Sequence, residues 1–168
     1  DNSKRDFIKK SITLGIIGIS GTATGLGFYN SRKGPSVIKH DIFLESLPES
    51  FNNFTIAQIS DLHIGPTIKR PYVENVLDKI SIHNPDLIAV TGDLVDGSVQ
   101  YLRSDLAPLK DMIAPFGTYF VTGNHEYYSG VDLWLDETDR LGMINLINSN
   151  ELISRSDDQI AIAGIRSE

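Results

Sequence analysis

Short apolar runs and longer amphipathic segments alternate along the chain from residue 36 onward. Apolar runs bounded by turn residues predict strands at residues 54–60, 86–92, 117–123, 144–148 and 159–165. The first three runs are the most apolar and predict buried strands. Residues 36–48 show a rougher alternation of apolar and polar positions, which predicts a strand that pairs at a sheet edge.

Three segments between these strands have apolar residues at helical spacing. The first begins at Pro71, a residue that suits a first helical turn, and its apolar face carries Val73, Val76, Leu77 and Ile80. A second helix is predicted at 101–113, where Pro108 interrupts it, and a third at 131–143, ended by Gly142 with Trp134 in the core. Strand–helix alternation of this kind predicts a layered α/β fold with parallel strands at its centre.

The N-terminal residues follow a different pattern. A basic head, "SKRDFIKK", precedes an uncharged run of 21 residues from Ser11 to Ser31. This order is typical of an export signal, and the run is close to the roughly 20 residues that cross a bilayer as a helix. Its five glycines argue against a buried core helix. The head also resembles the twin-arginine export motif, with Lys4 in place of the first arginine.

We therefore predict that residues 1–35 form a signal or membrane anchor plus a linker, and that residues 36–168 form one domain. Both a removed signal and an uncleaved anchor fit the sequence. The basic residues ahead of the run place the N-terminus in the cytoplasm and the domain outside it.

The amino-acid composition limits the class of protein and the kinds of site that the chain can form. Hydrophobic residues make up 40% and charged residues 22% of the chain, as in globular proteins. There are no cysteines, which excludes disulfides and thiolate metal sites. The net charge of −7 is uneven: residues 1–40 carry seven Lys or Arg against two Asp, and residues 41–168 carry eight against twenty acidic residues. A body this acidic is a poor non-specific binder of nucleic acid.

Polar side chains gather where the three buried strands end. They are Asp61, His63, Asp93, Asp96, Asn124, His125 and Glu126. Sites in open α/β sheets form beyond the carboxyl ends of the strands, so these residues are expected to share one site. Carboxylate, imidazole and amide ligands together suit divalent metals such as Mn, Fe or Zn. A nucleotide-binding α/β domain is less well supported, because no G-x-G-x-x-G follows the first strand.

The motifs D-L-H at 61–63, G-D-L-V-D at 92–96 and G-N-H-E at 123–126 stand about thirty residues apart. In order and spacing they resemble the motif blocks of calcineurin-like metallophosphoesterases, over roughly residues 36–165. The residues in and around these motifs are most similar to those of the bacterial envelope subgroup. The resemblance implies the N-terminal part of an α/β/β/α sandwich.

The resemblance also implies roles for these residues. Asp61 and His63 would bind a first metal ion, Asp93 would bridge two, and Asn124 would bind the second. His125 would face the substrate and stabilise the phosphoryl group, and it could also protonate the leaving oxygen. The roles implied for Asp96 and Glu126 are to orient the ligands and His125. The reaction would be hydrolysis of a phosphate ester by a bridging hydroxide that two metal ions activate.

One feature departs from the family pattern. The family takes further metal ligands from two later histidine blocks, whereas the histidines here are His40, His63, His83 and His125. We therefore expect this chain to be part of a longer protein. Alone, it is expected to bind metal weakly, to hydrolyse little and to expose an unfinished sheet edge.

Other candidates have simpler interpretations. His83 and His40 are expected at the surface. Tyr127 and Tyr128 either shape the mouth of the site or pack locally. Asp157 and Asp158 are expected in a turn, and a solvated helix face is expected to carry Asp136, Glu137 and Asp139.

The function predicted from the sequence is a two-metal phosphodiesterase at or beyond the membrane. A hydrolase of lipid-precursor pyrophosphates, of the UDP-diacylglucosamine type, is a close variant. A non-catalytic metal-binding remnant is an alternative from another class. Membrane association is expected through residues 11–31, and the oligomeric state is left open.

Overall fold

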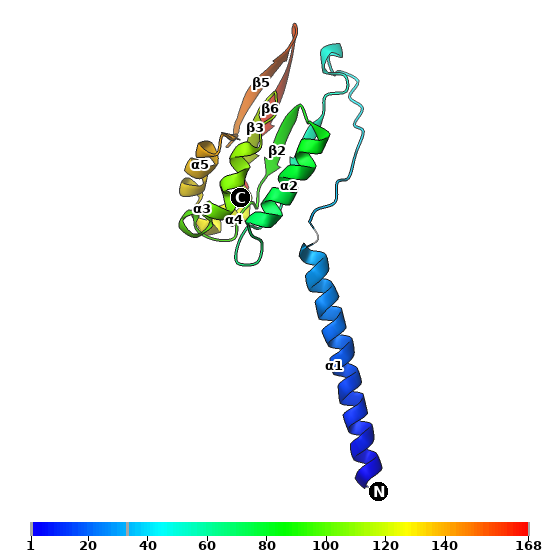
Figure 1. Cartoon of the computed structure of the whole chain (residues 1–168). Coiled ribbons are helices and arrows are strands. Elements are labelled where there is room, and N and C mark those ends of the chain that lie inside the picture. Colours follow the sequence, from blue (N-terminus) through cyan, green and yellow to red (C-terminus); the bar gives the residue numbers. More distant parts are fainter. Residues whose placement is uncertain (1, 33, 168) are drawn as a thin grey trace. The chain divides into compact units, whose positions relative to one another are not determined.

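The computed structural model describes residues 2–32 and 34–167. The chain divides into two compact units, Asp1–Pro35 and Ser36–Glu168 (Figure 1). In the first unit, residues 2–32 form one helix, α1 (Asn2–Arg32). Its segment Ser3–Phe28 is long and apolar enough to cross a membrane, and none of its most apolar window is buried. The predicted apolar N-terminal helix is confirmed, and a signal sequence or an anchor would both have this form.

The second unit is built on a parallel sheet with strand order β1-β2-β3-β4. The strands are β1 (Ile56–Ile59), β2 (Leu87–Thr91), β3 (Thr118–Val121) and β4 (Ile144–Asn145). The connecting helices are α2 (Arg70–His83), α3 (Val99–Leu106), α4 (Asn124–Ser129) and α5 (Val131–Arg140), with short 3-10 helices η1 (Glu49–Phe51) and η2 (Ala107–Asp111). The predicted α/β class is confirmed. Because all four strands run the same way, their carboxyl ends meet at one edge.

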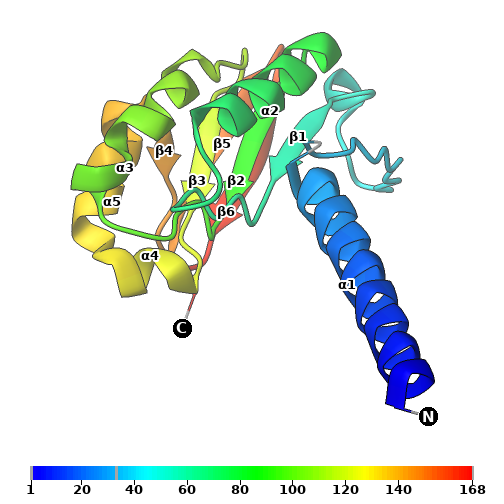
Figure 2. The ribbon, with the colours of Figure 1, turned by 60° about the horizontal axis from the view of Figure 1, so that its bottom comes forward.

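Successive residues of a strand point to opposite faces of the sheet, and both faces of this sheet are covered. Ile88 and Phe120 lie in a core with residues of the helices, including the fully buried Trp134. Their neighbours Leu87 and Tyr119 lie in a second core with Ile153. This second core lies under an antiparallel hairpin of β5 (Ser149–Arg155) and β6 (Asp158–Gly164). Figure 2 shows α2 and α3 on one side of β2 and β3, and β6 on the other.

The second unit thus has three layers: helices, a parallel sheet and a β-hairpin. An outer helical layer over the hairpin, as in the α/β/β/α sandwich expected by resemblance, is not among the described residues of this unit.

Several boundaries agree with the sequence. Helix α3 ends at Leu106 and η2 follows, so Pro108 does mark the interruption. Helix α5 ends at Arg140, and Gly142 takes a φ of 88° just beyond it. Trp134 is buried and its Nε1 donates to Gly97 O at 3.0 Å.

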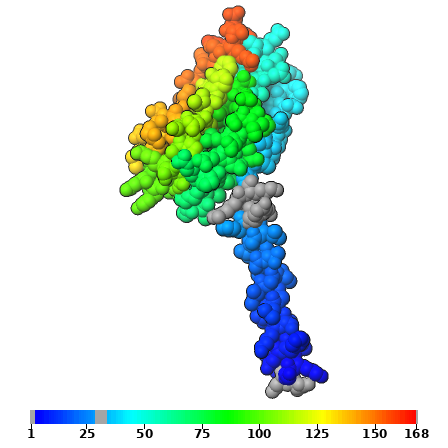
Figure 3. All heavy atoms as spheres, in the orientation of Figure 1, coloured from blue at the N-terminus to red at the C-terminus, as the bar shows by residue number. Residues whose placement is uncertain are grey.

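The predicted edge strand at 36–48 is wrong. Residues 34–44 take no regular structure and pair with no described strand. Ile38, Ile42 and Phe43 are 73%, 77% and 94% exposed, and residues 36–44 form part of the surface of the second unit (Figure 3). The alternation gives this segment one apolar face, but it does not decide pairing, and this segment pairs with neither of the edge strands, β1 and β4.

Two expectations about burial are also wrong. The strand at 54–60 exists, but Ile56 is 56% exposed because β1 is an edge strand. Glu137, expected on a solvated helix face, is only 1% exposed. The guanidinium groups of Arg140 and Arg103 bind its carboxylate at 2.6 and 3.0 Å, which compensates the burial of the charge.

Candidate metal centre

The loops that leave β1 and β2 run side by side and hydrogen-bond like a continued parallel ladder. Asp61 N donates to Gly92 O at 3.2 Å, and His63 N donates to Asp93 O at 3.0 Å. Ile64 N follows with a 2.9 Å bond to Leu94 O. These bonds fix the backbone of the D-L-H motif against the G-D-L-V-D motif.

The loop that leaves β3 packs against the second loop where neither has room for a side chain. Gly92 takes a φ of 86°, a conformation that glycine adopts readily. A Cβ on Gly123 would collide with the carboxylate and the backbone nitrogen of Asp93. The two glycines therefore set how closely the second and third loops approach.

Three candidate ligands lie on residues with left-handed backbone. The φ angles are 57° for Asp61, 45° for His63 and 51° for Asp93. Such values are uncommon outside glycine and cluster at functional sites. The conformation turns each of these side chains away from the direction that a regular strand would give it.

Glu126 ties the second and third loops together from inside. Its side chain is fully buried. Its carboxylate accepts hydrogen bonds from Gly123 N at 2.7 Å, Asp93 N at 3.0 Å and Leu94 N at 2.7 Å. Glu126 thus holds the backbone around Asp93, and the hydrogen bonds of its carboxylate go to this backbone rather than to the His125 ring.

The structure brings the donor atoms of the candidate ligands close together. Ligand atoms of Asp61, His63 and Asp93 all lie within 4.8 Å of one another. One end of the Asn124 amide lies 3.0 and 3.1 Å from the two carboxylate oxygens of Asp93, where its nitrogen can donate to both. An amide can also present its oxygen there, so Asn124 can serve as a neutral ligand. Two carboxylates, an imidazole and an amide form a donor set that fits divalent cations.

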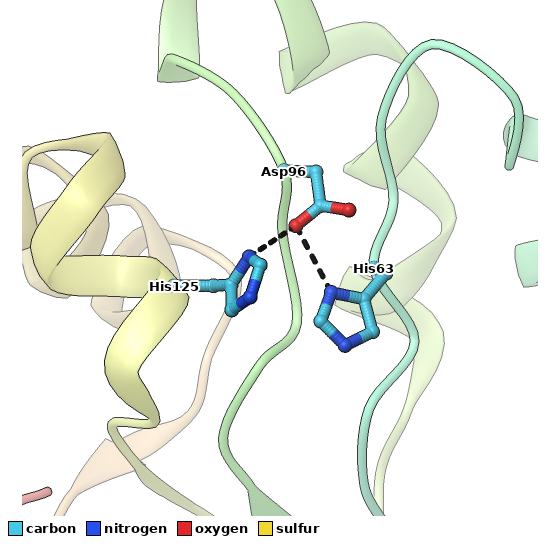
Figure 4. Close-up of side chains that lie close together, drawn as sticks. All are labelled: His63, Asp96 and His125. Atoms are coloured by element: carbon cyan, nitrogen blue, oxygen red, sulfur yellow. Dashed lines mark hydrogen bonds and ion pairs between the residues drawn. The ribbon is translucent and has the colours of Figure 1, made fainter.

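Asp96 links two imidazoles through one oxygen. Its Oδ1 lies 2.9 Å from His63 Nδ1 and 2.5 Å from His125 Nδ1 (Figure 4). Nε2 is then the nitrogen that each ring has left for another partner. In His63, Nε2 faces Asp61 Oδ1 at 3.8 Å, which points it into the donor group. A carboxylate on the far nitrogen of a metal-binding histidine commonly fixes its tautomer and orientation.

The same contacts shift two pKa values. The hydrogen bond to Asp96 raises the pKa of the His63 imidazole above its ordinary value, against the opposing effect of burial. Burial raises the pKa of the Asp96 carboxyl, but the hydrogen bonds and charges of His63 and His125 outweigh it, and the net pKa is lowered. Both directions favour an ion pair of carboxylate and imidazolium.

All the polar residues predicted at the three strand ends therefore lie in one cluster. Sequence reasoning missed one neighbour, Ser60, whose Oγ donates to the Asp61 carboxylate. For Tyr128 the sequence left two interpretations open, the mouth of the site or local packing, and the structure places its ring against His125, with ring centroids 5.7 Å apart. The adjacent Tyr127 uses its hydroxyl on Thr122 Oγ1 at 3.2 Å, so the structure separates two tyrosines that the sequence could not distinguish.

Comparison with known proteins agrees with this geometry. Residues 54–164 match the model of the calcineurin-like phosphoesterase family. A transmembrane protein with a metallophosphoesterase domain from Danio rerio is 37% identical over 143 residues, covering 83% of this chain and 33% of that protein. An uncharacterized metallophosphoesterase from Helicobacter pylori is 30% identical over 146 residues, or 87% of this chain and 38% of that protein.

A further uncharacterized metallophosphoesterase, from Bacillus subtilis, is 30% identical over 131 residues, covering 74% of this chain and 45% of that protein. The chain spans about a third to a little under half of the length of these relatives. The matched residues 54–164 contain all three strand exits and their polar side chains. The chain belongs to the calcineurin-like phosphoesterase family.

Proposed function

We propose that the protein hydrolyses phosphate esters with the help of two divalent cations, and that its substrates are phosphodiesters. The observation that supports this most is the convergence of Asp61, His63 and Asp93 within 4.8 Å at the exits of two neighbouring strands. Left without a cation, two carboxylates this close would repel each other.

In this proposal Asp61 and His63 would hold one cation, Asn124 would hold the other, and Asp93 would be a ligand that both share. When bound, Mn, Fe or Zn ions would activate water and neutralise charge that develops on phosphorus. The buried Glu126 keeps Asp93 in place through its backbone.

His125 is proposed to act on the substrate itself. Asp96 holds its Nδ1, which leaves Nε2 to contact a phosphoryl oxygen and to give a proton to the leaving oxygen. Asp96 would stabilise the imidazolium before the transfer, as a carboxylate behind a catalytic histidine does.

The test uses the full-length protein with a generic aryl phosphodiester and added Mn²⁺. We expect metal-dependent cleavage that Asp93→Asn reduces to background, because the amide cannot give two cations a shared charged ligand. Asp157→Asn, in the exposed turn between β5 and β6, is the matched control and should retain activity. Full turnover in Asp93→Asn would refute the assignment of Asp93.

The 168-residue chain alone is expected to bind Mn²⁺ weakly. Asp61, His63, Asp93 and Asn124 supply fewer donors than two such ions take, and the chain spans about a third to a little under half of these relatives. Isothermal titration calorimetry would measure this. Binding without any ester hydrolysis by the full-length protein would favour the non-catalytic alternative.

The apolar helix α1 supports a location at the membrane. We propose that it is an export signal of twin-arginine type or an anchor, as in the bacterial envelope subgroup, with the second unit outside the cytoplasm. A membrane location favours a lipid-precursor pyrophosphate as the alternative substrate. Comparing cleavage of a UDP-diacylglucosamine-type substrate in vesicles with cleavage of a soluble aryl phosphodiester would separate the two.

A further inference from the structure

Tyr128 is an exposed aromatic side chain at the candidate site. It lies near the end of α4, the short helix that begins with Asn124 and His125, and its side chain is 77% exposed. Its ring meets the His125 ring edge-on, at a centroid distance of 5.7 Å and an interplanar angle of 65°. Within the described residues its hydroxyl makes no hydrogen bond, whereas the hydroxyl of Tyr127 bonds to Thr122.

The position of Tyr128 beside His125 indicates which part of a substrate the Tyr128 ring would meet. Two rings lie against His125, those of His63 and Tyr128. His63 is engaged with Asp96 and faces Asp61, so it belongs to the donor group. Tyr128 is therefore the neighbouring ring that is left for the organic part of a substrate.

A proton donor must lie next to the oxygen that leaves. If His125 gives that proton, the alcohol attached to the leaving oxygen begins beside His125. The exposed ring of Tyr128 is then next to this alcohol. A tyrosine ring offers a planar apolar surface with a polar tip, and it stacks best on another planar ring.

We propose that Tyr128 is a specificity-determining residue that stacks on the leaving alcohol and favours planar aromatic or heteroaromatic leaving groups. This inference rests on the proposed function and on the role given there to His125. It assigns the leaving-group side of the site to the exposed face of α4.

The experiment compares two phosphodiesters in the full-length protein with Mn²⁺. Both carry a methyl group as the retained alcohol. One has phenol and the other hexafluoroisopropanol as the leaving group, which are similar in acidity but differ in planarity. Tyr128→Ala should lower kcat/KM for the phenyl ester about tenfold relative to the fluoroalkyl ester, because stacking of this kind is lost. The change should fall mainly on KM, since the ring contact exists before and during the reaction.

Two further variants sharpen the result. Tyr128→Phe retains the ring and should retain the preference. Tyr101→Ala is the matched control, because Tyr101 lies on α3 and is 78% exposed, almost the same as Tyr128. Its ratio between the two esters should equal that of the parent protein.

An equal loss on both esters in Tyr128→Ala would show a role in positioning His125 and would overturn the inference. So would an unchanged ratio with a preserved melting temperature. If the parent protein cleaves neither ester with Mn²⁺, the proposed function itself fails, and the assignment of Tyr128 falls with it.

Discussion

At the residue scale, carboxylates in the second unit differ mainly in what surrounds them. Asp96 uses one oxygen to orient two imidazoles, while the buried Glu126 receives three backbone N–H groups. Glu137 is buried as well, but it binds two arginines on the helical side of the sheet. The first two serve the candidate site, and the third fastens α5 to α3.

Glu126→Gln should weaken both stability and metal binding in the full-length protein. The amide cannot accept from all three backbone donors, so we expect a loss of about 1–3 kcal/mol in the free energy of unfolding. Because the freed backbone carries Asp93, Mn²⁺ affinity should fall by roughly 10–100-fold, as for residues that orient metal ligands. Denaturant unfolding and calorimetric titration would measure the two effects.

Glu151→Gln, at an exposed position of β5, is the control for this change. It should leave both quantities unchanged. Unaltered Mn²⁺ affinity in Glu126→Gln would contradict the positioning role of Glu126.

Glu137 should make stability depend on acid pH. Its hydrogen bond with Arg140 holds its pKa below the ordinary value of 4.5, with Arg103 adding to the effect against burial. A carboxyl with a lowered folded-state pKa stabilises the protein fully above its unfolded-state pKa, and this contribution is lost as the pH falls through the folded-state value. Melting temperatures from pH 7 down to pH 3 should therefore fall less steeply in Glu137→Gln. Parallel curves for the two proteins would rule out this contribution.

At the element scale, the sequence predicts the fold where burial sets the pattern. The runs that became β2 and β3 are buried on both faces, so their composition alone located them. The strand predicted at residues 36–48 is wrong, because an alternating pattern does not show whether the segment will pair with another strand. The gathering of Asp61, Asp93 and Asn124 was predictable, since parallel strands end at one edge. The left-handed backbone of Asp61 and Asp93 was not, because contacts between loops impose it.

Gly123→Ala should damage the site more than the fold. The new Cβ would push the third loop away from Asp93, with a cost of roughly 1–3 kcal/mol for overpacking. Mn²⁺ affinity should drop sharply in calorimetric titration, because Asn124 moves with that loop.

Gly142→Ala provides a matched control for strain. Gly142 has a φ of 88° but no atom within 4 Å of an added Cβ, so alanine there costs about 1–2 kcal/mol of backbone strain. Similar stability with different Mn²⁺ affinity in the two variants is the expected result. Equal affinities would show that the approach of the two loops does not shape the site.

At the scale of the whole molecule, the chain combines an apolar helix with an acidic body that has its own cores. The residues of the candidate site all lie in the body, within residues 54–164. The proposed function thus assigns location and chemistry to different stretches of sequence.

Replacing Ile16 and Ile17 with lysine should release the full-length protein from membranes. Each lysine at the centre of a spanning helix costs about 2.5–3.5 kcal/mol of insertion free energy. Extraction with alkaline carbonate followed by sedimentation would measure the fraction retained. Ile113→Lys, at a position 81% exposed in the second unit, should not alter it. Complete extraction of the parent protein would show that α1 is not an anchor, and a shortened mature N-terminus would then identify it as a removed signal.

The left-handed conformations of Asp61, His63 and Asp93 have a consequence for how such a protein can change over time. An L-residue in this conformation costs roughly 1–2 kcal/mol, whereas glycine adopts it freely. Asp61→Gly would therefore relieve strain in the chain while removing a donor, and the variant should melt no lower than its parent. Selection for robustness and selection for chemistry act in opposite directions at these positions. A homologue that has lost its reaction should be free to drift toward glycine there.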